Sequence, residues 1–329
     1  MREANLAIVG ATGMVGQTIK RVLEERDFPV NKILFLASKR SVGKKVMFKG
    51  KEHVVQELNE GSFKDIDIAL FSAGGAISKK YALIAKENGT VVVDNSSAWR
   101  MDEDVPLVVP EVNPEDAFSH KGIISNPNCS TIQAVLPLKV LDDLFKVKRV
   151  VYSTYQAVSG SGVAGVDDLK AGIQGKEPKN YPHPIAFNCL PHIDVFMDDG
   201  YTKEERKMID ETKKILKSSK MGVTATTVRV PVENGHSLSV NVELEKPYNL
   251  QSVLQSLNDK EGIVVLDDIK NNVYPMAINA HNTDDVYVGR LRRDFSLENG
   301  LNLWVVADNI RKGAATNTVQ IAELLLKED

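Results

Sequence analysis

Of the two cysteines in the chain, Cys129 stands where a thiol can act as a nucleophile. It follows the turn-forming residues Asn126-Pro127-Asn128 and precedes an apolar stripe of helical spacing that begins at Ile132. Unpaired N–H groups and the positive dipole end at a helix start stabilise a thiolate, which lowers a thiol pKa from its ordinary value of about 8.5. We therefore predict that Cys129 is a nucleophile, although a lone cysteine is often a small buried hydrophobe. Cys189 has no helix start behind it and is interpreted as structural.

A second chemical grouping is predicted around Arg229 and His236. Residues 227–240 read as two strands about a turn. A hairpin centred between Val232 and Glu233 makes Arg229 and His236 cross-strand partners, which brings a guanidinium beside an imidazole. The same centring mixes the apolar faces of the two strands, so the register stays open. A hydrogen-bonded structural histidine is the alternative interpretation of His236.

The run Thr202-Lys203-Glu204-Glu205 has the pattern of a capping box, which marks the start of a helix. Glu204 and Lys207 are three positions apart in that helix and therefore lie together at the edge of its apolar face. An exposed helical ion pair is the alternative. Arg100 follows the predicted strand at 91–96, on the side of the sheet where ligands bind, and an ordinary surface ion pair is its alternative.

The N-terminal part of the chain contains a strand, a glycine turn and a helix in succession. A fully apolar strand at 6–9 leads into a glycine turn at 10–16 and then into an amphipathic helix. Glycines allow a tight turn and a close approach to a pyrophosphate, whose charge the helix N-terminus favours. The spacing is G-x-x-G-x-x-G, so a chance glycine-rich turn is the alternative. The strand at 32–37 ends in Ser38 and Arg40 without the acid that binds the ribose of NAD, which favours NADP over a merely solvated basic loop.

Alternating strands and helices continue to about residue 96, and the continuous apolar strands predict a parallel, doubly wound sheet. Loops at the carboxyl ends of such strands line the ligand crevice. Ser159, Gly160 and Gln320 are added to these loops as further candidates. The predicted cofactor contacts are Gly10, Thr12, Gly13, Met14, Val15, Ser38, Arg40, Ser41, Ser72, Ala73, Gly74, Asn95, Ser159, Gly160 and Gln320.

The length of 329 residues predicts two domains of an α/β protein. We place a Rossmann-type NADP-binding domain at 1–126, completed by a C-terminal helix at 313–329. An α+β catalytic domain with a mixed sheet occupies 127–312. Within it, residues 163–193 are rich in Gly, Pro and Asn and are interpreted as an excursion that forms a cover or an interface.

Composition limits the partners. The chain is 43% hydrophobic and 26% charged with a net charge of −3, which gives no electrostatic reason to expect nucleic acid or an anionic membrane. Two cysteines fit a reducing cytoplasm, and neither a signal peptide nor an apolar run of about 20 residues is present. No His/Cys cluster has metal-ligand spacing, so no metal is expected.

Three segments in this order, residues 10–16, 126–133 and 229–236, resemble the aspartate-semialdehyde dehydrogenase family, and the resemblance covers essentially the whole chain. It implies that Cys129 is the nucleophile and that Gln156 orients the covalent intermediate. It further implies that Arg229 binds the substrate carboxylate and that His236 is the general acid/base, a role that suits a pKa of about 6.5.

The resemblance also implies a phosphate site and an amine site. Arg100 and Lys207 would hold phosphate, and Glu204 would position the substrate amine or Lys207. Asn128 joins the substrate contacts. Either Glu204 or its neighbour Glu205 could be the acidic residue of the site.

The implied reaction is the reversible, NADP-dependent reductive dephosphorylation of aspartyl phosphate to aspartate semialdehyde through a cysteine thioester. Such an enzyme would serve the biosynthesis of lysine, diaminopimelate, threonine, methionine and isoleucine in the cytoplasm, as a homodimer or homotetramer. Replacement of NADP by NAD and coupling between active sites stay open. The alternatives are a related N-acyl-glutamyl-phosphate reductase, a non-catalytic NADP-binding regulator, and a Cys-His hydrolase, which leaves the nucleotide-binding half unexplained.

Overall fold

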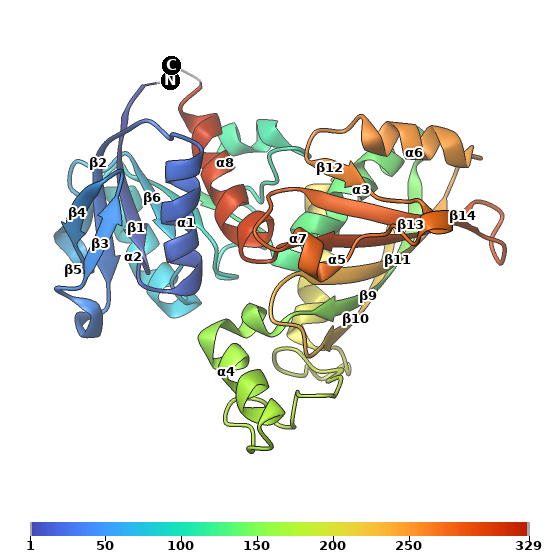
Figure 1. The fold of residues 1–329 in the computed structure, drawn as a ribbon. Helices are drawn as coiled ribbons and strands as arrows, with labels where there is room; N and C mark the ends of the chain where they lie inside the picture. The colour runs from blue at the N-terminus through green and yellow to red at the C-terminus, as the bar shows by residue number, and fades with distance from the viewer. Residues whose placement is uncertain (1, 328–329) are drawn as a thin grey trace. The chain divides into compact units, whose positions relative to one another are not determined.

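The computed structural model describes residues 2–327 and divides them into two compact units (Figure 1). The first unit comprises the chain up to Asn128 together with the residues from Ala314 onward, and the second unit runs from Cys129 to Gly313. The break after Asn128 falls two residues later than the predicted one, because the units divide where a helix begins rather than at the preceding turn.

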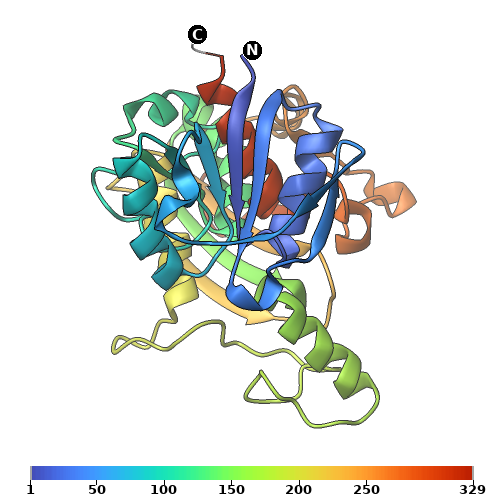
Figure 2. The same cartoon turned by 90° about the vertical axis from the view of Figure 1, so that its left-hand side faces the viewer.

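The first unit is built on a six-stranded parallel sheet of order β5-β2-β1-β6-β7-β8, shown in blue and cyan in Figure 2. Its strands are β1 Ala4–Val9, β2 Val30–Ala37, β5 Gln56–Glu57, β6 Ile68–Phe71, β7 Val91–Asp94 and β8 Ile123–Ser125. Its helices are α1 Met14–Glu25, α2 Gly75–Glu87 and α8 Thr316–Leu325, and a small antiparallel pair adds β3 Lys45–Phe48 and β4 Lys51–Val54. The predicted doubly wound sheet is confirmed.

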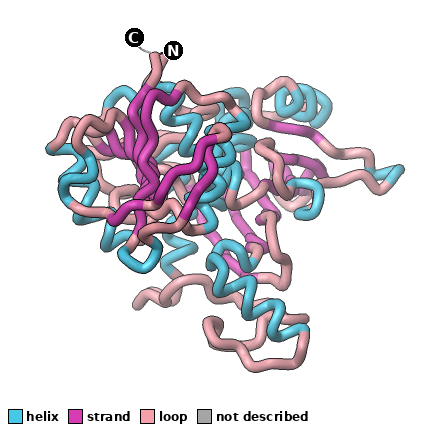
Figure 3. Tube along the Cα trace, turned by 60° about the vertical axis from the view of Figure 1, so that its left-hand side comes forward, coloured by secondary structure: helices cyan, strands magenta, loops and turns pink. Residues whose placement is uncertain are grey.

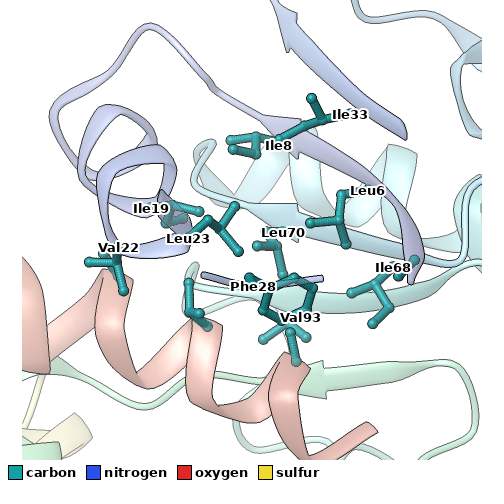
Figure 4. Packing of buried hydrophobic residues seen from close by; sticks show 14 of the residues in the cluster. Leu6, Ile8, Ile19, Val22, Leu23, Phe28, Ile33, Ile68, Leu70 and Val93 are labelled. Carbon is teal, nitrogen blue, oxygen red and sulfur yellow. The ribbon is translucent and has the colours of Figure 1, made fainter. Parts of the chain in front are cut away.

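Apolar side chains on both faces of this sheet are buried, which is why its strands read as continuous apolar runs. On one face, Ile19, Val22 and Leu23 of α1 pack with Leu6 and Ile8 of β1 (Figure 4). All five are fully buried. Each such side chain stabilises the fold by about 1.5–3 kcal/mol relative to an exposed one. The sheet is therefore a firm support for the loops at its strand ends.

The second unit is built on a six-stranded mixed sheet of order β10-β9-β11-β14-β13-β12. Its strands are β9 Val147–Gln156, β10 Gly222–Arg229, β11 His236–Leu244, β12 Ile263–Val265, β13 Val286–Asp294 and β14 Gly300–Ala307. Its helices are α3 Cys129–Phe145, α4 Gly162–Ile173, α5 Lys203–Ile215, α6 Leu250–Asn258 and α7 Ala277–Ala280. Helices α3, α5 and α6 pack against the sheet. The predicted mixed sheet is confirmed.

The predicted hairpin between β10 and β11 is wrong. Strand β9 lies between them and pairs in parallel with β10 and antiparallel with β11. The six residues from 230 to 235 form a wide connection across β9, whereas the prediction assumed that consecutive strands pair, which sequence-adjacent strands often but not always do. In the observed register Arg229 lies opposite Gln156 and Ser237 opposite Tyr155, so three predicted site residues end three neighbouring strands.

The predicted excursion at 163–193 contains the helix α4, followed by a long irregular segment that Figure 3 shows in pink. The buried carboxylate of Asp168 accepts the N–H groups of Lys179, Asn180 and Tyr181 and so ties this segment to the helix. The helix was not predicted because glycines weaken its periodic pattern. Among residues 2–327, no helix combines the length and the apolar character that crossing a membrane requires.

Candidate active site

Cys129 is the first residue of α3, as predicted, and its side chain is partly buried. The preceding turn belongs to the first unit and is held there by buried polar groups. Arg100, which is 7% exposed, donates from Nε to the Asn126 carbonyl at 3.0 Å and from Nη2 to the Asn95 carbonyl at 2.8 Å. Asn317 donates to Asn126 Oδ1 at 2.7 Å. The turn before α3 is therefore fixed by hydrogen bonds to its backbone and to the side chain of Asn126.

The side chains at the ends of β9, β10 and β11 form what we term the strand-end cluster: Gln156, Arg229 and His236. They are 1%, 4% and 0% exposed, respectively. The backbone of Ala157 joins two of them, because its carbonyl accepts from Arg229 Nη1 at 2.7 Å while its N–H donates to His236 Nδ1 at 3.0 Å. The guanidinium and the imidazole that the sequence placed together are thus held by the backbone N–H and carbonyl of one residue rather than by a hairpin.

The hydrogen bond from Ala157 determines the state of the His236 ring. Because Nδ1 accepts a hydrogen bond from the Ala157 N–H, the neutral ring carries its own proton on Nε2. Nε2 is buried and has no hydrogen-bond partner among the described residues. Burial, together with the nearby charge of Arg229, holds the pKa of His236 well below 6.5. The expectation of an ordinary pKa is therefore wrong, since the site disfavours an imidazolium.

Gln133 connects the helix of Cys129 to the strand of His236, a contact that the sequence analysis missed. Its fully buried amide donates to the His236 carbonyl at 3.1 Å and to the Val305 carbonyl at 3.5 Å. Gln133 lies four residues after Cys129 and hence on the same face of α3, about one turn further along. The one sequence feature that could have indicated this role is the polar amide of Gln133 among the apolar residues of α3.

Ser159 and Gly160, predicted as cofactor contacts, lie against the strand-end cluster in a 3₁₀ turn at Val158–Ser161. A Cβ atom at position 160 would approach Arg229 Nη1 to 2.7 Å and the His236 ring to 3.3 Å, so only glycine leaves both side chains in place. The Ser159 hydroxyl is buried against Asn309, whose Oδ1 also accepts the Gly235 N–H at 3.0 Å. Asn309, which the sequence analysis missed, thereby fixes the residue before His236.

A second group, which we term the helix-start cluster, consists of Glu204 and Lys207 of α5 with Asp194 from the preceding loop. Lys207 Nζ donates to Asp194 Oδ2 at 2.8 Å and to Glu204 Oε2 at 3.1 Å. Burial opposes the charge of Lys207, but the two carboxylates outweigh burial and raise its pKa. Gln156 Nε2 donates to Glu204 Oε1 at 3.2 Å, so the two clusters meet through this hydrogen bond.

The structure separates the two candidate acids. Glu205 closes the predicted capping box, in which its Oε2 accepts the Thr202 N–H at 2.7 Å while the Thr202 hydroxyl accepts the Glu205 N–H. Its other oxygen accepts the Thr227 N–H at 3.0 Å. Glu205 is therefore occupied in holding the start of α5, whereas Glu204 contacts side chains that are themselves site candidates.

In the first unit, the glycine turn between β1 and α1 fits a nucleotide. Gly10 has a φ of +84°, and a Cβ atom at Gly16 would come within 2.3 Å of the Gly10 carbonyl oxygen. Gly13 is the N-cap of α1 and brings no side chain to the first N–H groups of the helix. A pyrophosphate can therefore approach these donors closely.

The remaining candidates of the first unit follow the carboxyl ends of neighbouring parallel strands, where such sheets bind ligands. The Thr12 hydroxyl donates to Ser41 Oγ at 3.2 Å, which joins the first two of these loops. The Gln320 amide lies on α8 and donates to Glu111 at 2.7 Å. In chain order, Gly10, Thr12 and Gly13 lie in the turn after β1, with Met14 and Val15 as the first residues of α1; Ser38, Arg40 and Ser41 follow β2, Ser72, Ala73 and Gly74 follow β6, and Asn95 follows β7.

A parallel sheet with a glycine turn before its first helix is the architecture of dinucleotide-binding domains, and here the chain continues it with a mixed-sheet unit that carries two joined polar clusters. Comparison with known sequences agrees. Residues 5–120 match the family described as semialdehyde dehydrogenase, NAD binding domain. Residues 138–312 match semialdehyde dehydrogenase, dimerisation domain.

Similar proteins share the whole length of the chain. The aspartate-semialdehyde dehydrogenase of Aquifex aeolicus is 59% identical, with 98% of each chain covered. A crystal structure of aspartate semialdehyde dehydrogenase II from Vibrio cholerae, complexed with ASA, has a TM-score of 0.96 at 48% identity and covers 100% of this chain and 99% of its own. The enzyme from Candida albicans, solved with NADP, has a TM-score of 0.79 at 28% identity, with 98% of each chain covered. The chain belongs to the aspartate-semialdehyde dehydrogenase family, which confirms the resemblance.

Proposed function

We propose that the chain catalyses the reversible NADP-dependent reductive dephosphorylation of L-4-aspartyl phosphate to L-aspartate 4-semialdehyde and inorganic phosphate. The observation that carries the proposal is the joining of the two clusters through Gln156 and Glu204 in a chain of this family. Together they offer a carboxylate-binding guanidinium, an N–H donor, an ammonium and a carboxylate. These groups complement a substrate that bears a carboxylate, an amine, a reacting carbonyl and a phosphate.

In this proposal Cys129 is the nucleophile. Its thiolate attacks the acyl carbon, a C–S bond forms, and the C–O bond to phosphate breaks. Hydride from the bound nicotinamide is the one component that the side chains do not supply. After reduction the C–S bond breaks, which releases the aldehyde and restores the thiolate. Asn128 contacts the substrate beside the thiol, and Gln156 orients the thioester.

His236 serves the carbonyl oxygen. A neutral ring with its proton on Nε2 donates a hydrogen bond to that oxygen as negative charge develops on it. This replaces proton exchange through an imidazolium, which burial beside Arg229 disfavours. Arg229 binds the substrate carboxylate. Its Nη1 donates to the Ala157 carbonyl. Because the guanidinium is planar, this hydrogen bond fixes the orientation of its other N–H groups.

Phosphate and amine recognition are assigned to charged side chains. Lys207 and Arg100 hold the phosphate, and Glu204 accepts the substrate ammonium. The capping role of Glu205 supports Glu204 as the acid of the site.

NADP is the proposed cofactor. The loop after β2 carries Ser38, Arg40 and Ser41 and no carboxylate, which suits a 2′-phosphate. Gly10, Thr12, Gly13, Met14 and Val15 would hold the pyrophosphate, and the remaining contacts are Ser72, Ala73, Gly74, Asn95, Ser159, Gly160 and Gln320.

We further propose a cytoplasmic homodimer that works in the aspartate pathway to lysine and diaminopimelate, threonine, methionine and isoleucine. A hollow on the second sheet is lined by Tyr155, Ser239 and Trp304, and Tyr155 is 39% exposed. The match of residues 138–312 to a dimerisation domain supports contact through this unit. A Tyr155→Lys variant that sediments as a monomer would support this face as the interface. A variant that remains dimeric would exclude this face as the interface. A tetrameric wild-type protein would show that the assembly has a further interface.

The test follows absorbance of NADPH formed from aspartate semialdehyde with and without phosphate, repeated with NAD and with an N-acylated glutamate semialdehyde. Phosphate-dependent NADPH formation from the unacylated aldehyde is expected. Turnover of the acylated aldehyde instead would indicate the related reductase. NADP binding without turnover of either aldehyde would indicate a nucleotide-binding regulator.

A further inference from the structure

Lys207, the proposed phosphate-binding ammonium, is shared by two carboxylates. Its Nζ contacts Asp194 and Glu204, and the three side chains together carry a formal charge of −1. The side chain of Lys207 is 19% exposed and that of Glu204 is 6% exposed, so solvent screens this charge only in part. A phosphate dianion that approaches Lys207 therefore meets a group whose charge is already more than balanced.

Glu204 and Asp194 are held differently. Glu204 is buried on α5 and also accepts from Gln156, which places it within the joined clusters. The Asp194 side chain is 31% exposed and comes from the loop before the helix. Burial raises the pKa of Asp194, but its hydrogen bond with Lys207 and its contact with the Val195 N–H outweigh burial and lower it. Asp194 is therefore an anion beside Lys207 at neutral pH.

The backbone aims the Asp194 carboxylate. Asp194 has a φ of +67°, and its Oδ1 accepts the Val195 N–H at 2.9 Å while Oδ2 contacts Lys207. The Val195 carbonyl in turn accepts the Lys203 N–H at 2.9 Å, and Phe196 pairs with Thr202. The loop is thus closed onto the start of α5. One oxygen of Asp194 maintains this turn, and the other remains for Lys207.

We propose that Asp194 is a specificity-determining residue that competes with phosphate for Lys207 and so keeps the affinity for inorganic phosphate low. This inference rests on the proposed function, in which phosphate is a substrate in one direction and a leaving product in the other. A competing carboxylate weakens the product complex, so phosphate departs readily after the thioester forms. It also discriminates among anions, because a singly charged ion gains less at a site whose cation is already neutralised.

The test is Asp194→Asn. Asparagine tolerates a positive φ and can still accept the Val195 N–H through its Oδ1, so the turn is kept while the charge is removed. Asp194→Ala would instead strain the backbone. The expected result is a KM for phosphate roughly tenfold lower, with kcat and the KM for the aldehyde within about twofold of wild type. Inhibition by sulfate, measured against phosphate, should strengthen by the same factor.

The chain offers a matched control in Asp199→Asn. Asp199 lies on the same loop, pairs with Arg206 of the same helix and accepts the Tyr201 N–H, so this variant removes an equal charge from an exposed ion pair. It should leave the phosphate KM unchanged. Asp194→Glu retains the charge and should behave more like wild type than Asp194→Asn does.

Binding of inorganic phosphate measured by calorimetry gives a readout that does not depend on turnover. Tighter binding to Asp194→Asn, but not to Asp199→Asn, would support the inference. An unchanged or weaker phosphate affinity in Asp194→Asn, or an equal gain in Asp199→Asn, would overturn it. If the wild-type enzyme forms NADPH without any dependence on phosphate, the proposed function fails instead, and the two failures are thereby distinguished.

Discussion

The two clusters of the second unit hold their polar groups by different means. In the strand-end cluster, Arg229 and His236 are almost wholly buried and are fixed by the backbone carbonyl and N–H of Ala157. In the helix-start cluster, Lys207 is fixed by other charges and is partly open to solvent. Buried hydrogen bonds fix the orientation of the side chains that make them, because leaving a buried polar group unpaired costs free energy. Partly exposed ion pairs contribute little to stability, so a ligand can readily replace one of the partners. The first cluster suits orientation of a reacting carbonyl, and the second suits adjustable affinity.

The largest effect on activity should come from replacing Cys129, the first residue of α3. Gln133 connects this helix to the carbonyl of His236 in the strand-end cluster. Cys129→Ser should lower kcat by about three orders of magnitude or more, because a serine hydroxyl at this position has no base to activate it. NADP binding should persist, since the glycine turn lies in the first unit. Initial rates and fluorescence titration with NADPH measure the two properties. Wild-type rates in the variant would refute the assigned nucleophile.

Gln133→Met tests whether orientation depends on the connection between α3 and β11. Methionine fills a similar volume but cannot donate to the His236 carbonyl, so a small shift of Cys129 relative to His236 should lower kcat roughly tenfold. Gln255→Met on the exposed face of α6 is the matched control. Steady-state kinetics and thermal unfolding are the measurements. A fall in stability without a change in kcat would reduce Gln133 to a purely structural residue.

Variants of the neighbouring residues Glu204 and Glu205 separate a proposed role in the site from a role in holding the helix start. Glu205→Gln should cost about 1–2 kcal/mol of unfolding free energy, because one carboxylate now accepts two backbone N–H groups, and should change kcat/KM little. Glu204→Gln should lower kcat/KM roughly tenfold with a smaller loss of stability. Urea unfolding and kinetics of both variants decide the matter. The reverse pattern would make Glu205 the acid of the site.

The smallest effect concerns pH. Because the pKa of His236 in the folded protein lies well below the ordinary 6.5, the unfolded chain binds a proton there first as the pH falls. This group should therefore leave stability unaffected above about pH 7. Below about pH 6.5 it should lower stability by up to about 1.4 kcal/mol per pH unit, until the folded-state pKa is reached. In His236→Asn, an amide oxygen can replace Nδ1 as acceptor for Ala157, and this slope should be absent. Urea unfolding at several pH values compares the two proteins, and parallel curves would contradict the assigned state of the ring.

The fold of the first unit could be predicted because its strands are buried on both faces and appear as unbroken apolar runs. The second sheet was harder. The pairing of β10 and β11 with β9 depends on long-range register, which local alternation between Arg229 and His236 does not contain.

The positions of candidate residues with a local signature were predictable. Cys129 precedes an apolar helical stripe, and the capping box marks the start of α5. The amide of Ala157 carries no side-chain signal at all, and Gln133 and Asp194 acquire their roles only through partners distant in the sequence.

The position of β9 between β10 and β11 has a consequence for how the chain folds. Ala157 contacts a residue 72 positions later in β10 and another 79 positions later in β11, with the whole excursion and α5 between them. Contacts of such long sequence separation form slowly. The chain must lose the entropy of closing a long loop before these contacts contribute any favourable free energy. On refolding, the circular-dichroism signal of the helices should therefore recover before enzymatic activity does. The chain should pass through an intermediate that has helical structure but no activity.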